Sequence, residues 1–184
     1  MRILVAYASK HGATAGIAER IGTGLARDGH AVDVRPVRAV SDVSEYDAFV
    51  VGSSVYFTHW NAAAKKFVLD NRDLLASRPV WLFSSGPVSA QRTDDGGDLR
   101  QASEPKELPE LVDAIGPVGH RVFFGAVDPS GLTLAERAIR SLPAGRELLP
   151  EGDFRDWEDV DGMAVEIAGR LASDGGPEGR PPLR

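Results

Sequence analysis

The stretch YASKHGATAGIAE, residues 7–19, joins an apolar run to a helical pattern through a short polar turn. The run at 3–8 is typical of a buried β-strand, and apolar residues then recur every four positions over 17–25, as on one face of a helix. Between them the turn holds the hydroxyl groups of Ser9 and Thr14, one glycine and no acid. A strand, a tight polar turn and a helix in this order predict one unit of an α/β sheet.

Apolar runs and helical patterns alternate along the rest of the chain, which predicts a parallel sheet with helices on both faces. The second strand alternates apolar and charged residues and meets Pro36, features of an edge strand. We therefore predict an α/β doubly wound sheet of five parallel strands in the order 2-1-3-4-5. The strands are expected at 3–8, 31–34, 48–52, 80–84 and 122–127, and the helices at 14–27, 61–75, 107–115 and from Trp157 onward.

The length of 184 residues fits one domain with a substantial core. We expect a single domain over 1–172 and a disordered tail over 173–184, which is rich in glycine and proline. Two long segments, at 86–104 and 129–154, do not fit the simple alternation of strands and helices. Both follow the carboxyl ends of strands, where long loops tend to be functional, so we expect them to border a cavity.

Composition removes several classes of function. A net charge of −6 argues against nucleic-acid binding, which usually needs a basic face. The chain has no cysteine and only four scattered histidines, so no metal site is expected. No apolar run approaches the ~20 residues that span a bilayer, and we expect no signal peptide before the first strand. The expected location is cytoplasmic, with at most peripheral membrane contact.

The opening turn has the chemistry of a phosphate site. In the order 2-1-3-4-5 the strand order reverses beside the first strand, and ligands bind at that point. Backbone N–H groups and the dipole at a helix start attract an anion. Ser9 and Thr14 add hydroxyl donors, Gly12 allows close approach, and Lys10 and His11 contribute backbone N–H groups. The Walker pattern GxxxxGK[ST] is absent, so the turn favours a mononucleotide, with a simple helix-capping turn as the alternative.

The pattern Ser9-x-x-Gly12-x-Thr14 resembles the FMN-phosphate loop of flavodoxins. The resemblance continues after the third strand at 51–57 and after the fourth at 84–87, loops that flank the isoalloxazine ring in flavodoxin-like proteins. It implies FMN as the cofactor, with the chemistry on the flavin and no catalytic side chain. The implied FMN-binding residues are Ser9, Lys10, His11, Gly12, Ala13, Thr14, Ser53, Ser54, Val55, Tyr56, Phe57, Ser84, Ser85, Gly86 and Pro87.

Within that family, residues 54–60 (SVYFTHW) resemble the menaquinone-dependent protoporphyrinogen oxidase branch, as do the insert after the fifth strand and the late Asp156-Trp157-Glu158. This likeness implies oxidation of a reduced small molecule, with electrons passed to a quinone. One alternative is a flavodoxin-type one-electron carrier, whose acidic surface would suit basic redox-protein partners. Another is a domain that binds no flavin and acts in protein interactions. His30 and His120, which precede the second and fifth strands, are expected in solvent.

Overall fold

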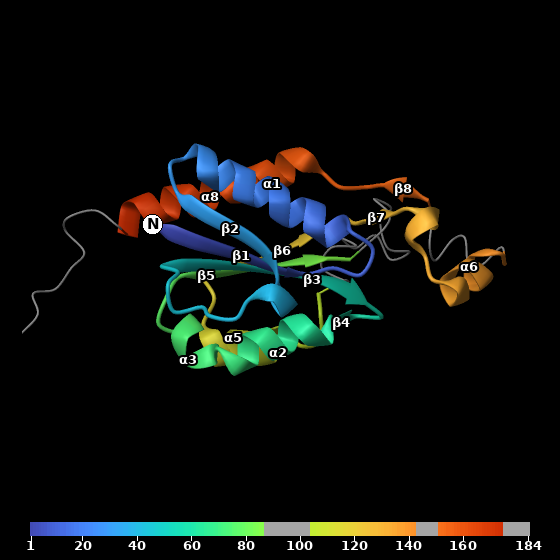
Figure 1. Ribbon diagram of the computed structural model, residues 1–184, viewed down its shortest axis with the longest axis horizontal. Coiled ribbons are helices and arrows are strands. Elements are labelled where there is room, and N and C mark those ends of the chain that lie inside the picture. Colours follow the sequence, from blue (N-terminus) through green and yellow to red (C-terminus); the bar gives the residue numbers. More distant parts are fainter. Residues whose placement is uncertain (87–103, 143–150, 175–184) are drawn as a thin grey trace, which may run out of the picture.

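The computed structural model describes residues 1–86, 104–142 and 151–174 (Figure 1). Pro87 and most of the 86–104 segment therefore lie outside the described residues. The elements are β1 (Arg2–Ala8), α1 (Ala13–Arg27), β2 (Ala31–Pro36), η1 (Val37–Ala39), β3 (Ala48–Tyr56), β4 (His59–Trp60), α2 (Ala62–Asp70), α3 (Arg72–Leu75), β5 (Val80–Ser85), α5 (Leu108–Ile115), β6 (Gly119–Phe123), β7 (Ala126–Val127), η2 (Pro129–Gly131), α6 (Leu134–Arg140), β8 (Gly152–Asp153) and α8 (Trp157–Asp174).

The main sheet is parallel, with the order β2-β1-β3-β5-β6. Because β5 and β6 are the fourth and fifth predicted strands, the predicted order 2-1-3-4-5 is confirmed, and β2 lies at an edge. The short β4 pairs antiparallel with β3 and was not predicted. The predicted fifth strand at 122–127 is wrong in extent. Its second half is β7, which leaves the sheet and pairs with β8.

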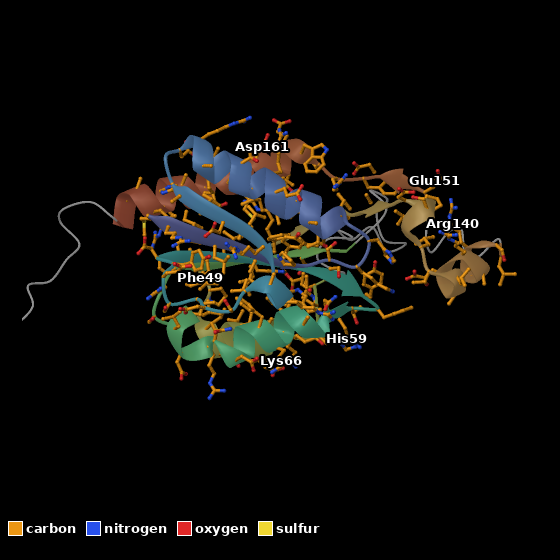
Figure 2. All side chains as sticks on the ribbon, in the orientation of Figure 1. Phe49, His59, Lys66, Arg140, Glu151 and Asp161 are labelled. Atoms are coloured by element: carbon orange, nitrogen blue, oxygen red, sulfur yellow. The ribbon has the colours of Figure 1, made fainter. Side chains whose placement is uncertain are left out.

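Each face of the sheet is covered by its own helices (Figure 1). Alternate residues of β1 point to opposite faces, so Ile3 joins the core under α1 and α8, whereas Leu4 joins the core over α2 and α5. Figure 2 shows Phe49 in the second of these cores. Since β1 and α8 meet in one core, we propose that 1–172 form a single domain. Helix α8 runs past residue 172 to Asp174, and 175–184 lie outside the described residues.

Gly52 makes room for a buried ring at the middle of the sheet. It lies on β3, and a Cβ atom at this position would overlap the ring of Phe83 on β5. Phe83 is fully buried and packs edge-on against Phe123 of β6. A glycine is therefore required here for packing.

Within the described ranges, no helix combines the length and apolar character that crossing a bilayer would require.

Candidate functional site at the carboxyl edge of the sheet

A cavity of about 430 Å³ opens where β1, β3 and β5 end. Its volume lies in the range of small-molecule sites, ~300–1,000 Å³. The structure brings together at its wall most of the predicted site residues: Ser9, Lys10, His11, Ala13, Thr14, Ser54, Val55, Tyr56, Phe57, Ser85 and Gly86. Three loops far apart in the sequence thus meet at the point where the strand order reverses.

The opening turn leaves the start of α1 available to a ligand. Helix α1 begins at Ala13, after Gly12 in the left-handed conformation with φ of 89°. The Gly12 amide donates to Ser9 Oγ at 3.0 Å. No side chain caps the described start of this helix, and its first turn holds no acid. Thr14 is only 1% exposed and lines the cavity. The turn therefore presents N–H groups and a buried hydroxyl, which suit an anion.

The two neighbouring serines near the end of β3 have different roles. Ser54 Oγ is buried and has no hydrogen-bond partner in the part of the chain that the structure describes. Such a group is costly unless a ligand or water satisfies it, and Ser54 lines the cavity. Ser53 does not line it, because its hydroxyl accepts from the Asn61 amide at 2.9 Å and donates to the Ser54 carbonyl at 3.0 Å. Of this pair, Ser54 is thus the serine that is free to contact a cofactor.

The β3–β4 hairpin holds aromatic side chains at the cavity mouth. Its two turn residues, Phe57 and Thr58, have positive φ angles of 50° and 65°, which are strained for residues other than glycine. Phe57 is 92% exposed. Burial and the charge of Glu136 raise the pKa of Tyr56 to about 12, so its hydroxyl stays protonated. The neighbouring His59 does not line the cavity, and its Nδ1 lies 2.7 Å from Glu107 Oε1.

The insert after β6 forms the outer wall of the cavity and supplies residues that sequence reasoning missed. Leu132, Glu136 and Ile139 all line it. Helix α6 starts with a capping box in which Thr133 and Glu136 bond each other, and the TLAE pattern at 133–136 signals this helix start in the sequence. At the other end of α6, Arg140 donates to Glu151 at 2.9 Å (Figure 2). The expectation that 129–154 border a cavity is met by these residues.

A chain of hydrogen bonds that is largely shielded from solvent lies behind the cavity wall. Trp60 Nε1 donates to Ser84 Oγ at 2.7 Å, and Ser84 Oγ lies 2.8 Å from His120 Nε2. Ser84, a predicted FMN contact, therefore has both of its bonds directed into the protein and does not line the cavity. The expectation that His120 is in solvent is wrong, because β6 pairs it with Leu82 of β5 and its ring contacts Ser84. Burial lowers the pKa of His120 to about 4.

This depressed pKa predicts a loss of stability in mild acid. Unfolded His120 takes up a proton near pH 6.5, whereas the native imidazole stays neutral until about pH 4. As the pH falls from 6.5 to 4, we expect its contribution to the free energy of unfolding to drop by at most about 3 kcal/mol. Urea titrations of the wild type and of His120→Gln across this range measure the effect. If the difference in free energy of unfolding between the two proteins does not change with pH, the predicted contribution of His120 is contradicted.

The doubly wound sheet and the turn at its switch point define the flavodoxin-like class of α/β proteins. The model of the flavodoxin domain matches residues 4–143, and the chain belongs to that family. FMN is the cofactor of the family, so the expected cofactor is confirmed. No curated protein matches the sequence.

Solved structures share the fold. A flavodoxin from the domain Archaea is 20% identical with a TM-score of 0.56, and the match covers 94% of this chain and 99% of that one. Flavodoxin 2 from Bacillus cereus is 20% identical with a TM-score of 0.57, over 92% and 99% of the two chains. Rubredoxin oxygen:oxidoreductase from Desulfovibrio gigas is 16% identical with a TM-score of 0.61, over 94% of this chain and 36% of that one.

Proposed function

We propose that FMN occupies this cavity, with its phosphate at the start of α1 and its ring between the β3–β4 hairpin and the end of β5. The unpartnered hydroxyl of Ser54 and the uncapped helix start support this placement, because both are polar groups that lack a partner among the described residues. Thr14 and the backbone of the turn would hold the phosphate, and Tyr56 or Phe57 would contact the ring. When bound, FMN supplies the capacity to take up and release two electrons.

We further propose that the protein is an FMN-dependent oxidoreductase that oxidises a reduced small molecule and passes the electrons to a quinone. The observation that carries this proposal is the wall formed by the insert, since Leu132, Glu136 and Ile139 enclose the cavity beside the hairpin. A pure carrier needs its flavin edge open to partner proteins, whereas an enzyme needs a walled pocket for a small substrate. The substrate would lose two electrons and two protons, and the quinone would take up the same number to become a quinol.

The likeness to the protoporphyrinogen oxidase branch supports a reduced small molecule as the electron donor. The insert here mixes charges, with Arg137, Arg140, Glu136 and Glu151, and it has no aromatic residue before Phe154. A mixed-charge insert favours a soluble or peripheral quinone over deep attachment to a membrane.

Ile139 offers a test of the enzyme proposal. It lines the cavity and is 48% exposed, so a carboxylate at this position would disfavour an apolar quinone at the wall. We expect Ile139→Asp to lower turnover with menadione about tenfold, with FMN affinity nearly unchanged. The matched control is Val165→Asp, at an apolar residue of α8 that is 68% exposed and does not line the cavity. Equal turnover of the two variants would contradict the enzyme proposal.

A one-electron carrier is the second candidate. The net charge of −6 favours it, because an acidic surface suits docking to basic redox proteins. A spectroelectrochemical titration separates the two functions. Two well-separated one-electron potentials with no quinone turnover would favour the carrier, whereas one two-electron step with turnover would favour the enzyme.

A further inference from the structure

Glu136 connects the insert to the turn that we assign to the FMN phosphate. Lys10 Nζ donates to Glu136 Oε1 at 2.6 Å, and His11 Nε2 lies 3.1 Å from the same oxygen. His11 Nδ1 lies 3.1 Å from the carbonyl oxygen of Gly131, which also belongs to the insert. The Glu136 side chain is only 14% exposed. A carboxylate of the insert thus already engages two polar side chains of the phosphate turn.

The second oxygen of Glu136 fixes the carboxylate in place. Oε2 accepts from the Thr133 amide at 2.9 Å and from the Thr133 hydroxyl at 2.8 Å. Burial by itself would raise the pKa of Glu136, but the hydrogen bonds from Lys10, Thr133 and His11 outweigh it and lower the pKa to about 2. The Glu136 side chain is therefore an anion at neutral pH.

We propose that Glu136 determines the affinity of this protein for the phosphate of its flavin, because the carboxylate and the phosphate compete for Lys10 and His11. The inference rests on the proposed FMN site. A phosphate monoester carries a charge of about −1.5 to −2 at pH 7, so it both attracts Lys10 and repels Glu136. Binding of FMN then weakens the contact between α6 and the turn. Riboflavin, which has the same ring and no phosphate, leaves that contact intact.

The substitution Glu136→Gln isolates the charge. Glutamine serves at this position of a capping box as glutamate does, so the start of α6 is preserved. We expect this variant to bind FMN about three- to tenfold more tightly than the wild type, with riboflavin affinity unchanged. The matched control is Glu110→Gln on α5, which removes a carboxylate paired with Lys65 at 2.7 Å and not lining the cavity. This control should change neither the FMN affinity nor the riboflavin affinity. Quenching of flavin fluorescence measures both affinities in the wild type and in each variant.

Hydrogen exchange of residues 132–142 gives a second readout. In the wild type, FMN should raise the exchange of this segment relative to riboflavin, and in Glu136→Gln the two ligands should give equal exchange. Two results would overturn the proposed competition between Glu136 and the phosphate while leaving the FMN site in place. One is an unchanged FMN affinity in Glu136→Gln, and the other is an equal increase in affinity for FMN and for riboflavin. Failure of the wild type to bind FMN at all would instead overturn the proposed site, and this inference with it.

Discussion

Replacing Gly52 with alanine is expected to destabilise the protein by about 3 kcal/mol or more, at the upper end of what overpacking a core costs. The new methyl group would overlap three ring carbons of Phe83. That ring is fully buried and packs against Phe123, so it has no open space to move into. Gly52 also lies on β3, between β1 and β5, and the strand cannot shift without disturbing both neighbours. Urea denaturation followed by circular dichroism measures the loss.

Two further variants make the packing argument specific. Adding Phe83→Leu to Gly52→Ala should recover part of the lost stability, because the smaller side chain frees space for the methyl group. Gly169→Ala on α8 is the matched control, since nothing lies within 4 Å of a Cβ atom there. It should stabilise the helix by up to about 1 kcal/mol. A loss below about 1 kcal/mol for Gly52→Ala, with no recovery in the double variant, would contradict the role of Phe83.

The second large effect is expected at Thr14. Replacing it with valine keeps the shape of the side chain and removes its hydroxyl. If that hydroxyl donates to the FMN phosphate, the variant should lose roughly 1.5–3 kcal/mol of FMN binding, the range for a hydrogen bond to a charged group. This corresponds to about 10- to 150-fold in Kd. Riboflavin affinity should stay almost the same, because that ligand has no phosphate.

Thr23→Val on the same helix is the control for Thr14→Val. Thr23 is exposed, and its hydroxyl donates to the Glu19 carbonyl within the helix at 2.8 Å, so its loss should leave FMN binding unchanged. An equal loss of FMN and riboflavin binding in Thr14→Val would show that the substitution acts through folding and would remove Thr14 from the phosphate site.

The sheet could be predicted from the sequence because four of its five predicted strands are continuous apolar runs of the kind that burial on both faces requires, and the alternating second strand indicated an edge. The β3–β4 hairpin could not. Its turn residues are Phe57 and Thr58, both with positive φ angles, and this turn conformation is normally predicted from asparagine and glycine in the sequence. The turn at 9–14 and the ends of β3 and β5 could be assigned to one site because strand order alone brings them together.

The remaining parts of the site depend on contacts over long sequence separations. The capping pattern at 133–136 indicates where α6 begins, but nothing local indicates that Glu136 reaches Lys10, which is 126 residues away. Similarly, Ser53 and Ser54 are identical residues in adjacent positions. The two hydrogen bonds of the Ser53 hydroxyl, from the Asn61 amide and to the Ser54 carbonyl, distinguish the structural serine from the one that faces the cavity.

The core under α1 also constrains how this chain can fold during synthesis. Ile3, Ile17 and Ile21 are completed in that core by Val160 and Ile167 of α8, which is synthesised after all the other described elements. A nascent chain that ends before Trp157 therefore leaves exposed the part of this core that α8 covers. Closing that face requires a contact that spans most of the sequence, and such contacts form slowly. We therefore expect variants truncated before Trp157 to expose apolar surface and to aggregate more readily than the full chain.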